Sequence, residues 1–399
     1  MRIVILTEGP FPYGMAATTR MVTYARGMIE AGAEVSVLCT KPTEAPGENL
    51  RNTEIKGDFE GIHFNYTAGT TSRSPVAFKR LILYYTGFFR AKKELRRMQE
   101  KANINVLFMG LSNFWFTWSH SRWSHKNKVL FVQERSEYPF IGVTGPWQKM
   151  KLGFYLRVTC KLFDVILVIT RALENYFSNW IRKDARIYLL PMLVEAERFR
   201  GHNEKPAGLP GKYIAYVGSM QGNKDGVPIL IESFARISAS HPEMHLVLIG
   251  ETGFDGFEGL KKLVEDRGLS HRVQFTGRLE WDELPAFLGS ANYLALARPS
   301  SQQAEGGFPN KLGEYLATGK AVVVTAVGEI PDFLTDGENA FISVPDDVQA
   351  FADKLKEVLD DPERAKMIGE RGGELVDTVF HPGLQARKLL NFFHELRKA

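Results

Sequence analysis

The chain is poor in the features that mark secreted and membrane-spanning proteins. Only two of its 399 residues are cysteines, Cys39 and Cys160, and both lie in segments that we expect to be buried. Two such thiols predict neither a disulfide framework nor a metal cluster, and they fit a reducing compartment. No apolar run reaches the roughly 20 residues of a membrane-spanning helix. Because Met1 leads directly into a strand-like segment and not into a secretory signal, we expect a cytoplasmic protein.

Two ligand-binding motifs are missing as well. No G-x-G-x-x-G sequence follows the first strand-like run, residues 2–7, so a dinucleotide is not favoured. No D-x-D carboxylate pair is present for a divalent cation, and we expect no bound metal. The composition, 44% hydrophobic and 24% charged, is that of a globular chain with ample core, and the length favours two domains.

Positive charge is concentrated in the first half of the chain. Residues 1–200 hold 29 Lys or Arg against 17 Asp or Glu, a net charge of +12, whereas residues 201–399 hold 21 against 29, a net charge of −8. A basic half beside an acidic half indicates that the first half faces an anionic partner. The alternative is that charge drifts between two halves of this length without any partner.

Two segments of the basic half also carry many aromatic residues. One is 75–101, with eight Lys or Arg between Lys79 and Lys101, and the other is 146–163, with its basic residues between Lys149 and Lys161. Each is typical of an amphipathic helix at an anionic membrane surface, which predicts peripheral attachment to the inner face of a membrane. The alternative is a helix packed on its own sheet, with its aromatic side chains in the core and a solvated basic face.

Apolar strand-like runs alternate with helical patterns in both halves, which predicts an α/β fold with two Rossmann-like domains over residues 1–200 and 201–380. Residues 41–60 are polar and read as a surface loop, and 200–212, with two prolines and three glycines, read as a linker. A helix is expected over 381–399. The strand-like runs are 2–7, 34–40, 61–67, 104–109, 129–133, 164–170, 186–190, 213–218, 245–251, 291–297 and 321–325, and further helical patterns cover 15–31, 227–238 and 346–378.

The most informative stretch runs from Arg298 to Asn339. A polar loop, Ser300 to Gly307, follows a strand-like run, and Pro309 stands where a helix could begin. That helix is expected to end at Gly319, before the β-branched strand 321–325. A strand, a glycine-rich loop and a helix start in this order aim free backbone N–H groups at an anion.

This stretch resembles the donor site of retaining glycosyltransferases with the GT-B fold, of the family 4 type found in bacterial glycan biosynthesis. The similarity is carried by PNKLGEYLATGK, residues 309–320, and TAVGEIPDFLTDGENAF, residues 325–341. It implies two Rossmann-like domains that face each other across a cleft, the first for the acceptor and the second for a nucleotide-sugar donor. It also implies that the last helix crosses back to the first domain. Over the first half the resemblance is one of topology only.

The resemblance assigns roles to two glutamates. In the family, two Glu residues are separated by seven others; the second binds the ribose, and the loop of the first holds the sugar. Glu314 matches the second position. Glu305 is one residue early, because eight residues separate it from Glu314 and Gly306 takes the strict position. Either the loop has a one-residue bulge and Glu305 contacts the sugar, or Glu305 is a solvated loop residue.

The diphosphate site departs from the family pattern. The family has an Arg directly after the Gly of the first strand of the second domain and a Lys five residues later; here Ser219 replaces the Arg and Lys224 matches the Lys. Arg298 or Lys311 is our candidate for the missing cation. The donor-binding positions that the resemblance implies are Gly14, Met15, Ser219, Lys224, Gly250, Arg278, Leu279, Arg298, Gly306, Gly307, Phe308, Pro309, Asn310, Lys311 and Glu314, with Arg278 and Leu279 contacting the base.

The acceptor side is less well defined. Several family members have a His near the position of Gln133 and Glu134 that approaches the donor sugar, and this sequence has none there. We take Glu134 and Arg135 as substitutes, because sites in open α/β sheets gather at the carboxyl ends of strands. An internal pair between these two residues is the alternative. The expected catalytic residues are then Glu305, Lys224 and Glu134, with Arg135 contacting the acceptor.

The function that follows is transfer of a sugar from a UDP- or GDP-sugar to a glycan or lipid-linked acceptor, with retention of anomeric configuration, without a metal and without a nucleic-acid partner. Two carboxylates near one loop could suggest a glycoside hydrolase, but hydrolases place them on opposite sides of the bond. The alternatives that stay open are a nucleotide-sugar epimerase on the same fold and a non-catalytic protein that binds sugar nucleotides.

Overall fold

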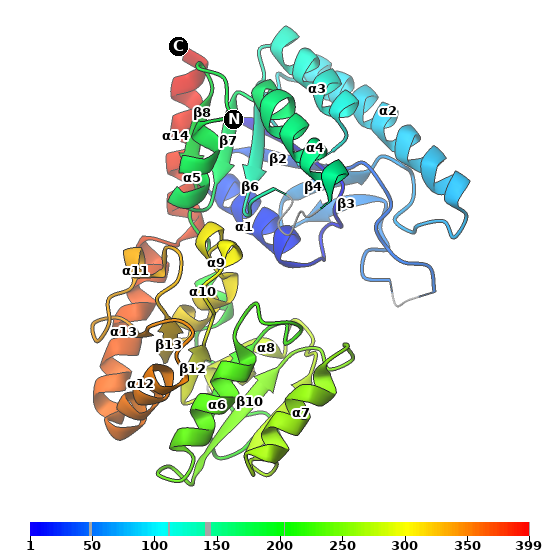
Figure 1. Cartoon of the computed structure of the whole chain (residues 1–399). Coiled ribbons are helices and arrows are strands. Elements are labelled where there is room, and N and C mark those ends of the chain that lie inside the picture. The colour runs from blue at the N-terminus through cyan, green and yellow to red at the C-terminus, as the bar shows by residue number, and fades with distance from the viewer. Residues whose placement is uncertain (48–49, 111, 140–144, 203, 399) are drawn as a thin grey trace. The chain divides into compact units, whose positions relative to one another are not determined.

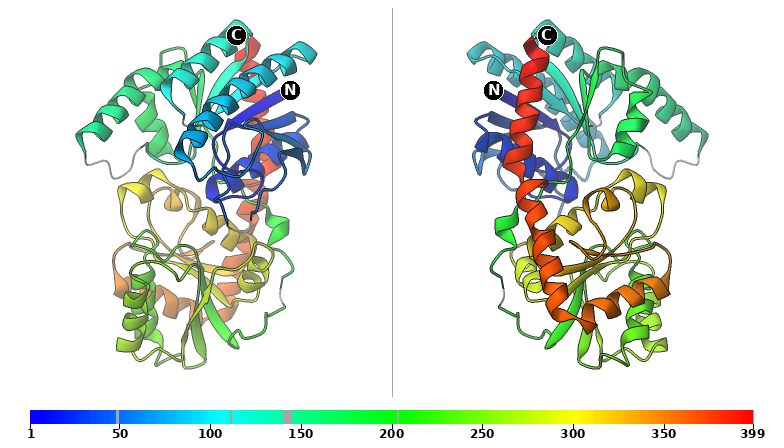
Figure 2. Two further views of the ribbon diagram at one scale, coloured as in Figure 1. Left: turned by 90° about the vertical axis from the view of Figure 1, so that its right-hand side faces the viewer. Right: turned by 90° about the vertical axis from the view of Figure 1, so that its left-hand side faces the viewer.

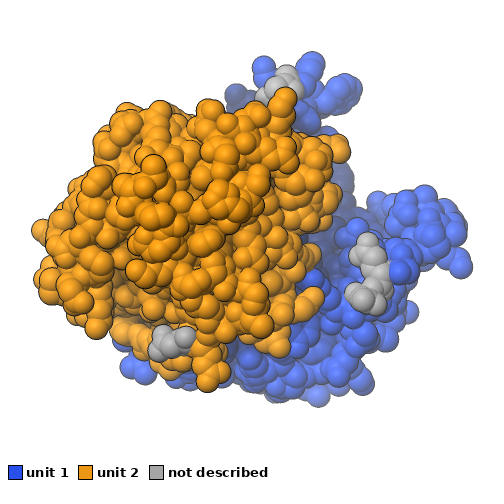
Figure 3. Space-filling view, turned by 90° about the horizontal axis from the view of Figure 1, so that it is seen from below, with its two compact units in different colours: residues 1–191, 382–399 blue, residues 192–381 orange. Residues whose placement is uncertain are grey.

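The computed structural model describes residues 1–47, 50–110, 112–139, 145–202 and 204–398. The chain forms two compact units, which Figure 3 marks by colour. Unit 1 comprises Met1–Pro191 and Pro382–Ala399, and unit 2 comprises Met192–His381. The first unit therefore ends before the expected boundary at residue 200, and the expected linker 200–212 lies within unit 2.

Unit 1 is built on an eight-stranded sheet of order β3-β4-β2-β1-β5-β6-β7-β8. All neighbouring strands are parallel except β3 and β4, which pair antiparallel. The strand β3 was not expected: it lies in the predicted loop 41–60, at the edge of the sheet, where none of its four residues is buried and no apolar run marks it. The strands are β1 (Arg2–Thr7), β2 (Glu34–Cys39), β3 (Lys56–Phe59), β4 (Ile62–Tyr66), β5 (Val106–Met109), β6 (Leu130–Arg135), β7 (Val165–Val168) and β8 (Arg186–Leu189).

The helices of unit 1 cover this sheet (Figure 1). They are α1 (Ala16–Glu30), α2 (Ala77–Lys101), α3 (Phe114–Lys126), α4 (Pro146–Phe154), α5 (Arg171–Ser178) and α14 (Pro382–Lys398), and two short turns, η1 (Tyr155–Thr159) and η2 (Cys160–Leu162), continue α4. The last helix, α14, is drawn in red in both views of Figure 2 and packs on α1. Gly27 permits this contact, because a Cβ there would lie 2.6 Å from the carbonyl oxygen of Pro382.

Unit 2 has a parallel six-stranded sheet of order β11-β10-β9-β12-β13-β14. Its strands are β9 (Lys212–Val217), β10 (Met244–Ile249), β11 (Val273–Gly277), β12 (Tyr293–Leu296), β13 (Ala321–Thr325) and β14 (Phe341–Ser343). Its helices are η3 (Ala196–Arg198), α6 (Val227–Ile237), α7 (Phe257–Asp266), α8 (Leu284–Gly289), α9 (Gln302–Gly306), α10 (Asn310–Ala317), α11 (Ile330–Phe333), α12 (Val348–Asp360) and α13 (Pro362–Thr378). The helix expected over 346–378 is two helices, since Pro362 starts a new one capped by Asp361.

The central strands form the cores of both units. All five residues of β13 are buried, as expected for a parallel strand covered on both faces. Cys39 and Cys160 are buried free thiols, as the sequence predicts. Within the ranges that the structure describes, no helix is long and apolar enough to cross a membrane.

Each sheet has one point at which the order of the strands reverses. In unit 1 this point lies between β1 and β5, and in unit 2 it lies between β9 and β12. Ligands of open α/β sheets bind beyond the carboxyl ends of the strands at such a point. In unit 2 the loops that leave it are Gly218–Gly226, after β9, and the stretch that begins at Ala297, after β12.

Candidate functional site

The two loops at the reversal point of unit 2 meet at Lys311. Gly218, directly after β9, has φ of 150°, and a Cβ there would lie 1.9 Å from the Lys311 Nζ atom. Any side chain at residue 218 would therefore displace the lysine as well as strain the backbone. The ammonium group of Lys311 thus lies against the end of β9, next to Ser219, where the family pattern has an arginine.

A buried carboxylate holds Lys311 in this position. The Asp225 Oδ2 atom accepts hydrogen bonds from Lys311 Nζ at 2.5 Å and from the Tyr216 hydroxyl at 2.9 Å, and Asp225 is only 5% exposed. The Lys311 ammonium also lies 4.8 Å from the centre of the Tyr216 ring. Burial lowers the pKa of Lys311, and the neighbouring carboxylates of Asp225 and Glu314 oppose this shift. No sequence pattern marks Asp225 as part of the site, because it lies outside every motif.

Helix α10 carries both Lys311 and Glu314. They are three residues apart and therefore lie on one face of the helix. The hydroxyl oxygen of Tyr315 accepts a hydrogen bond of 2.8 Å from the backbone N–H of Val217, which ties α10 to the end of β9. A Cβ at Gly313 would lie 2.2 Å from Val194 Cγ2, so α10 also packs closely on the first residues of unit 2.

Glu314 is half-buried, and its surroundings have opposite effects on its charged form. Burial raises the pKa of the Glu314 carboxyl, while Arg198 and Lys311 act to lower it. Arg198, at the end of η3, stacks 3.2 Å from the centre of the Trp281 ring and donates a hydrogen bond to the Trp281 carbonyl oxygen. Sequence reasoning missed Arg198, which precedes the motif by more than a hundred residues.

The segment from Arg298 to Pro309 differs from the expected loop. Residues 302–306 form the short helix α9, capped by the Ser301 hydroxyl, which accepts a hydrogen bond of 3.1 Å from the Ala304 N–H. Arg298 is buried and donates a hydrogen bond of 3.1 Å to the Gln303 carbonyl oxygen, so it supports α9 from within unit 2. The helix forms because Ser301 caps it and Ala304 is buried, and neither feature produces a hydrophobic period in this polar segment.

The glutamate and the glycines of this segment differ in exposure. Glu305 is exposed, Gly306 is buried and Gly307 is half-buried. Phe308 is buried, and its ring lies 5.6 Å from that of Phe333. Phe308 can therefore offer a ligand its backbone but not its ring. Pro309 precedes α10 as its N-cap residue, and Asn310 is the first residue of the helix.

The remaining predicted donor residues lie along the carboxyl ends of β9, β10 and β11. Ser219 and Lys224 are exposed on the loop between β9 and α6. Gly250 follows β10, and a Cβ there would lie 2.0 Å from the Gly218 carbonyl oxygen; the close approach it permits is thus to the neighbouring strand. Arg278 is exposed and Leu279 is half-buried, directly after the positive-φ residue Gly277.

The predicted residues of unit 1 lie beyond the ends of β1 and β6. Gly14 precedes α1, where a Cβ would lie 2.2 Å from Thr18 Oγ1, and Met15 is exposed. Glu134 does not pair with Arg135. Its Oε1 atom instead accepts hydrogen bonds from the buried Arg20, at 2.8 Å, and from Ser136, at 2.6 Å.

Arg135 is itself buried. It donates a hydrogen bond of 3.3 Å to the Glu137 carbonyl oxygen, and its guanidinium lies 5.7 Å from the centre of the Tyr155 ring. Glu134 and Arg135 therefore each have a structural partner other than one another. The partner of Glu134 could not be found from the sequence, because Arg20 is 114 positions away.

The chemistry of the unit 2 site is that of an anion site next to a carboxylate. The Lys311 ammonium and the positive end of the α10 dipole attract negative charge, and the Glu314 carboxylate can accept hydrogen bonds from hydroxyl groups. Among the described residues, no three His, Cys, Asp or Glu side chains are grouped as metal ligands would be.

Comparisons with known proteins show similarity to glycosyltransferases. Residues 198–374 match the family model described as Glycosyl transferases group 1. A GDP-mannose-dependent alpha-(1-6)-phosphatidylinositol monomannoside mannosyltransferase of Mycolicibacterium smegmatis is 26% identical over 219 residues, which cover 52% of this chain and 56% of that protein. The matched region spans less than two thirds of the length of the curated relatives, 56% of this one and 61% of its counterpart in Mycobacterium tuberculosis.

Solved structures match over nearly the whole chain. The sucrose-phosphate synthase of Thermosynechococcus elongatus has a TM-score of 0.74 at 17% identity, covering 99% of this chain and 98% of that one. Anabaena HepE in complex with UDP-glucose has a TM-score of 0.66 at 14% identity, covering 99% of this chain and 100% of that one. At this identity the likeness bears on the fold. Residues 198–374 are therefore similar to the glycosyl transferases group 1 family, and the chain has the GT-B fold, with two Rossmann-like α/β units.

Proposed function

We propose that this protein transfers a sugar from a nucleotide-sugar donor to a glycan or lipid-linked acceptor, with retention of anomeric configuration. The observation that carries the proposal is the position of the Lys311 ammonium against Gly218, three residues before Glu314 on the same helix. A cation and a carboxylate side by side at the reversal point of a parallel sheet suit the diphosphate and the ribose of one nucleotide.

In this proposal Lys311 supplies the positive charge of the family's arginine, whose position Ser219 occupies here. Lys311 and Lys224 neutralise the donor diphosphate. The bond between the anomeric carbon and the diphosphate oxygen breaks as the acceptor oxygen bonds to that carbon, and the proton of the acceptor hydroxyl passes to the leaving diphosphate. Fixed cations and backbone N–H groups stabilise the charge that develops on the leaving oxygen. Glu314 accepts hydrogen bonds from the ribose, and Arg278 and Leu279 contact the base.

The sugar itself is assigned to α9 and the residues after it. Glu305 is exposed on α9, two residues before the half-buried Gly307, and is proposed to accept hydrogen bonds from the sugar hydroxyls. Glu134 is not retained as a catalytic group, because Arg20 and Ser136 already occupy its Oε1 atom. Its proposed role is to position the end of β6.

For the nucleotide of the donor and for the acceptor we propose only a chemical class. The relative from Mycolicibacterium smegmatis is named for GDP-mannose and a phosphatidylinositol mannoside, and the structurally similar HepE was solved with UDP-glucose. These names support a UDP- or GDP-sugar donor and a lipid-linked or glycan acceptor. The net charge of +12 in residues 1–200 supports an acceptor at the inner face of an anionic membrane.

A two-part experiment tests the function. Thermal unfolding is first followed with UDP- and GDP-sugars; a ligand at 100 times its Kd stabilises the folded protein by about 2.7 kcal/mol. The donor that stabilises most is then incubated with lipid extract or oligosaccharide acceptors, and free nucleotide and glycosylated product are measured. Product that keeps the donor's anomeric configuration supports the proposal. An epimerised free sugar, or donor binding without transfer to any acceptor tested, contradicts it.

A further inference from the structure

Helices α2, α3 and α4 of unit 1 leave large apolar side chains in water. Trp147 is 73% exposed, Phe78 69%, Trp115 68% and Phe89 63%. Isolated exposed apolar residues are ordinary, whereas a group of large ones marks an interaction surface. We define the outer helical surface by its exposed apolar residues, which are Phe78, Leu81, Ile82, Tyr85, Phe89, Trp115, Trp118, Trp147, Met150, Phe154 and Val158.

On α2 the exposed residues form a regular stripe. Phe78, Leu81, Ile82, Tyr85 and Phe89 recur at the spacings i, i+3, i+4, i+7 and i+11, which place them on one side of a helix. The residues of α2 that are buried, Gly87, Phe88, Ala91 and Leu95, follow a different stripe. Helix α2 therefore has two apolar sides, of which its own unit covers one.

Helix α4 has no buried residue, and only Leu152 and Gly153 are half-buried. All nine of its residues are described, and they include Trp147, Met150 and Phe154. Ring contacts join the three helices into one surface: Tyr85 of α2 lies 5.7 Å from Phe116 of α3, and Phe114 of α3 lies 5.0 Å from Phe154 of α4.

Basic residues surround these apolar side chains. Helix α2 holds eight Lys or Arg against two Glu, and neither α3 nor α4 holds an Asp or Glu. The exposed basic residues near the apolar ones are Lys79, Arg80, Arg90, Lys93, Arg122, Lys149, Lys151 and Arg157. Apolar rings beside cations without matching anions complement a partner that is apolar inside and negative at its surface.

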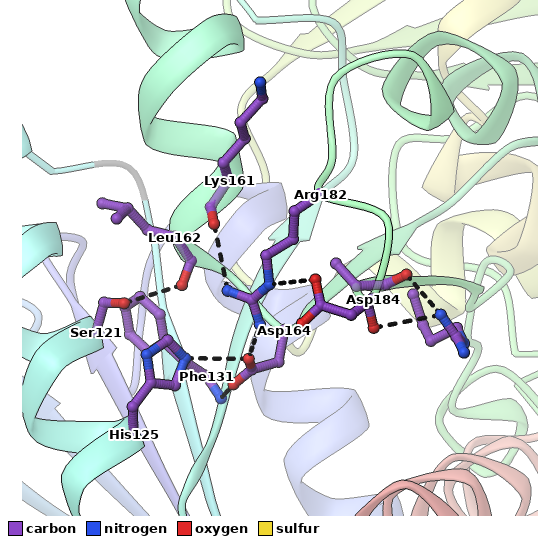
Figure 4. A network of polar contacts seen from close by, with 10 residues as sticks. Ser121, His125, Phe131, Lys161, Leu162, Asp164, Arg182 and Asp184 are labelled. Carbon is purple, nitrogen blue, oxygen red and sulfur yellow. Dashed lines mark hydrogen bonds and ion pairs between the residues drawn. The ribbon is translucent and has the colours of Figure 1, made fainter.

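A polar network holds the base of this surface in place (Figure 4). Asp164 accepts hydrogen bonds from the Phe131 N–H at 2.8 Å and from Arg182, and it lies 3.1 Å from the ring Nε2 of His125 on α3. Ser121 of α3 donates a hydrogen bond of 3.0 Å to the carbonyl oxygen of Leu162, the last residue of η2 in the extension of α4. These contacts fix α3 to the sheet and to the end of the extension that follows α4, so the outer side chains of α3 are presented on a fixed support.

We infer that the outer helical surface binds the interfacial region of an anionic lipid bilayer, with its tryptophan and phenylalanine rings among the acyl chains and its Lys and Arg side chains at the headgroups. Tryptophan rings prefer this region, and basic residues add attraction to anionic lipid. The charge decides between a bilayer and an apolar protein partner, because a protein interface core is depleted in lysine. The inference concerns unit 1 alone and stands whether or not the site in unit 2 transfers sugar.

Cosedimentation with vesicles tests it. Vesicles of phosphatidylcholine with 30 mol% phosphatidylglycerol, about a third anionic lipid as a test composition, are compared with phosphatidylcholine alone at low and high salt. The parent protein is expected to bind the anionic vesicles at least tenfold more tightly, and less tightly as salt rises, since screening shortens the reach of surface charge. The variant Phe78→Ser/Trp147→Ser and the variant Lys149→Glu/Lys151→Glu should each lose about tenfold in affinity.

Matched controls lie in unit 2. Met367→Ser removes an exposed apolar side chain there, and Lys262→Glu/Lys366→Glu reverses two exposed lysines; both should bind vesicles as the parent does. All substituted residues are exposed, so thermal unfolding is expected to stay unchanged and is measured for each variant. Failure of the parent to bind anionic vesicles at low salt overturns the inference, and so does an equal loss in the unit 2 controls.

Discussion

Single residues of the unit 2 site work against the stability of the fold. Glu314 is a half-buried carboxylate whose pKa is raised by burial, and Lys311 is an ammonium whose pKa is lowered by burial. Each charge is partly offset by the other and by Arg198 or Asp225. Perturbed pairs of this kind are common where a protein holds a charged ligand, because the ligand supplies the remaining partners.

Replacing Glu314 by alanine should weaken nucleotide binding. A hydrogen bond to a charged group contributes about 1.5–3 kcal/mol, so Glu314→Ala is expected to raise the Kd for UDP or GDP roughly 10–100-fold. Titration calorimetry measures the change, and circular dichroism checks the fold. An unchanged Kd in a folded variant removes Glu314 from the ribose site.

Replacing Glu314 by glutamine should change the dependence of stability on pH. Near pH 4, below the ordinary carboxyl pKa of about 4.3, Glu314 is largely neutral in both the folded and the unfolded chain, so its burial adds no electrostatic cost. As the pH rises through the raised folded-state pKa, the folded protein must ionise a group that the unfolded chain ionises more easily, and stability falls.

Glu314→Gln is therefore expected to be more stable than the parent at pH 7 and equal to it near pH 4. Urea unfolding at both pH values, without ligand, measures the two differences. A variant that is less stable than the parent at pH 7 shows that Arg198 and Lys311 outweigh burial at this residue.

Removal of the Lys311 charge should affect phosphate and not nucleoside binding. Lys311→Met alone leaves Asp225 buried without its cation, which costs about 3–5 kcal/mol, so Asp225→Asn/Lys311→Met is the variant to use. Its Kd for UDP or GDP is expected to rise about 10–100-fold, and its Kd for uridine or guanosine less than threefold. Lys224→Ala, on the exposed loop, serves for comparison and should lower turnover more than it lowers nucleoside-monophosphate binding. Equal losses for nucleoside and diphosphate in the double variant contradict the role of Lys311.

At the scale of elements, α10 is fixed at three points. Tyr315 accepts a hydrogen bond from β9, Lys311 reaches Asp225 before α6, and Gly313 lies against Met192 and Val194. Eight residues are too few for a helix to be stable by itself, so these contacts decide its position.

Gly313→Ala tests how closely α10 is packed. The added Cβ would lie 2.2 Å from Val194 Cγ2 and 2.7 Å from Met192 Cε, so the substitution should cost about 1–3 kcal/mol although alanine favours helix. Gly259→Ala in α7 is the matched control, because no atom lies within 4 Å of its added Cβ, and it should stabilise by about 0.5–1 kcal/mol. Chemical unfolding measures the free energy of unfolding of both variants. A stabilising Gly313→Ala would show that residues 192–194 move aside at little cost.

At the scale of the whole molecule, the chain returns to unit 1 for its last helix. Phe393 of α14 is fully buried, and its ring lies 5.9 Å from that of Phe108 in β5. A core element of unit 1 therefore comes from a segment nearly two hundred residues beyond the rest of that unit.

Phe393→Ala should loosen unit 1 selectively. Loss of a buried phenylalanine side chain costs about 3–5 kcal/mol, whereas Leu384→Ala at an exposed position of the same helix should change stability by less than about 0.5 kcal/mol. Hydrogen exchange followed by mass spectrometry is expected to rise in α1, β1 and β5 and to stay unchanged in β9 and β12. Faster exchange in unit 2 alone contradicts this assignment of α14.

The sequence by itself determined the α/β class, the two βα series and the central strands, because buried parallel strands are continuous apolar runs that local reading detects. It also determined the family resemblance, since residues 309–341 form one contiguous stretch with a recognisable pattern. It did not reveal β3, because this strand forms through its pairing with β4 and its own four residues carry no apolar pattern. Nor did it resolve α9 or the break at Pro362.

Only the tertiary structure decided which residues share a site and which aromatic side chains meet water. Lys311 reaches Asp225 across 86 positions and Glu134 reaches Arg20 across 114, and no local pattern encodes such distances. The same holds for α2, where Phe88 is buried and Phe89 exposed although the two are adjacent and identical. A helical period shows that apolar residues share one side of a helix, but whether that side faces a sheet or solvent is set by what packs against it.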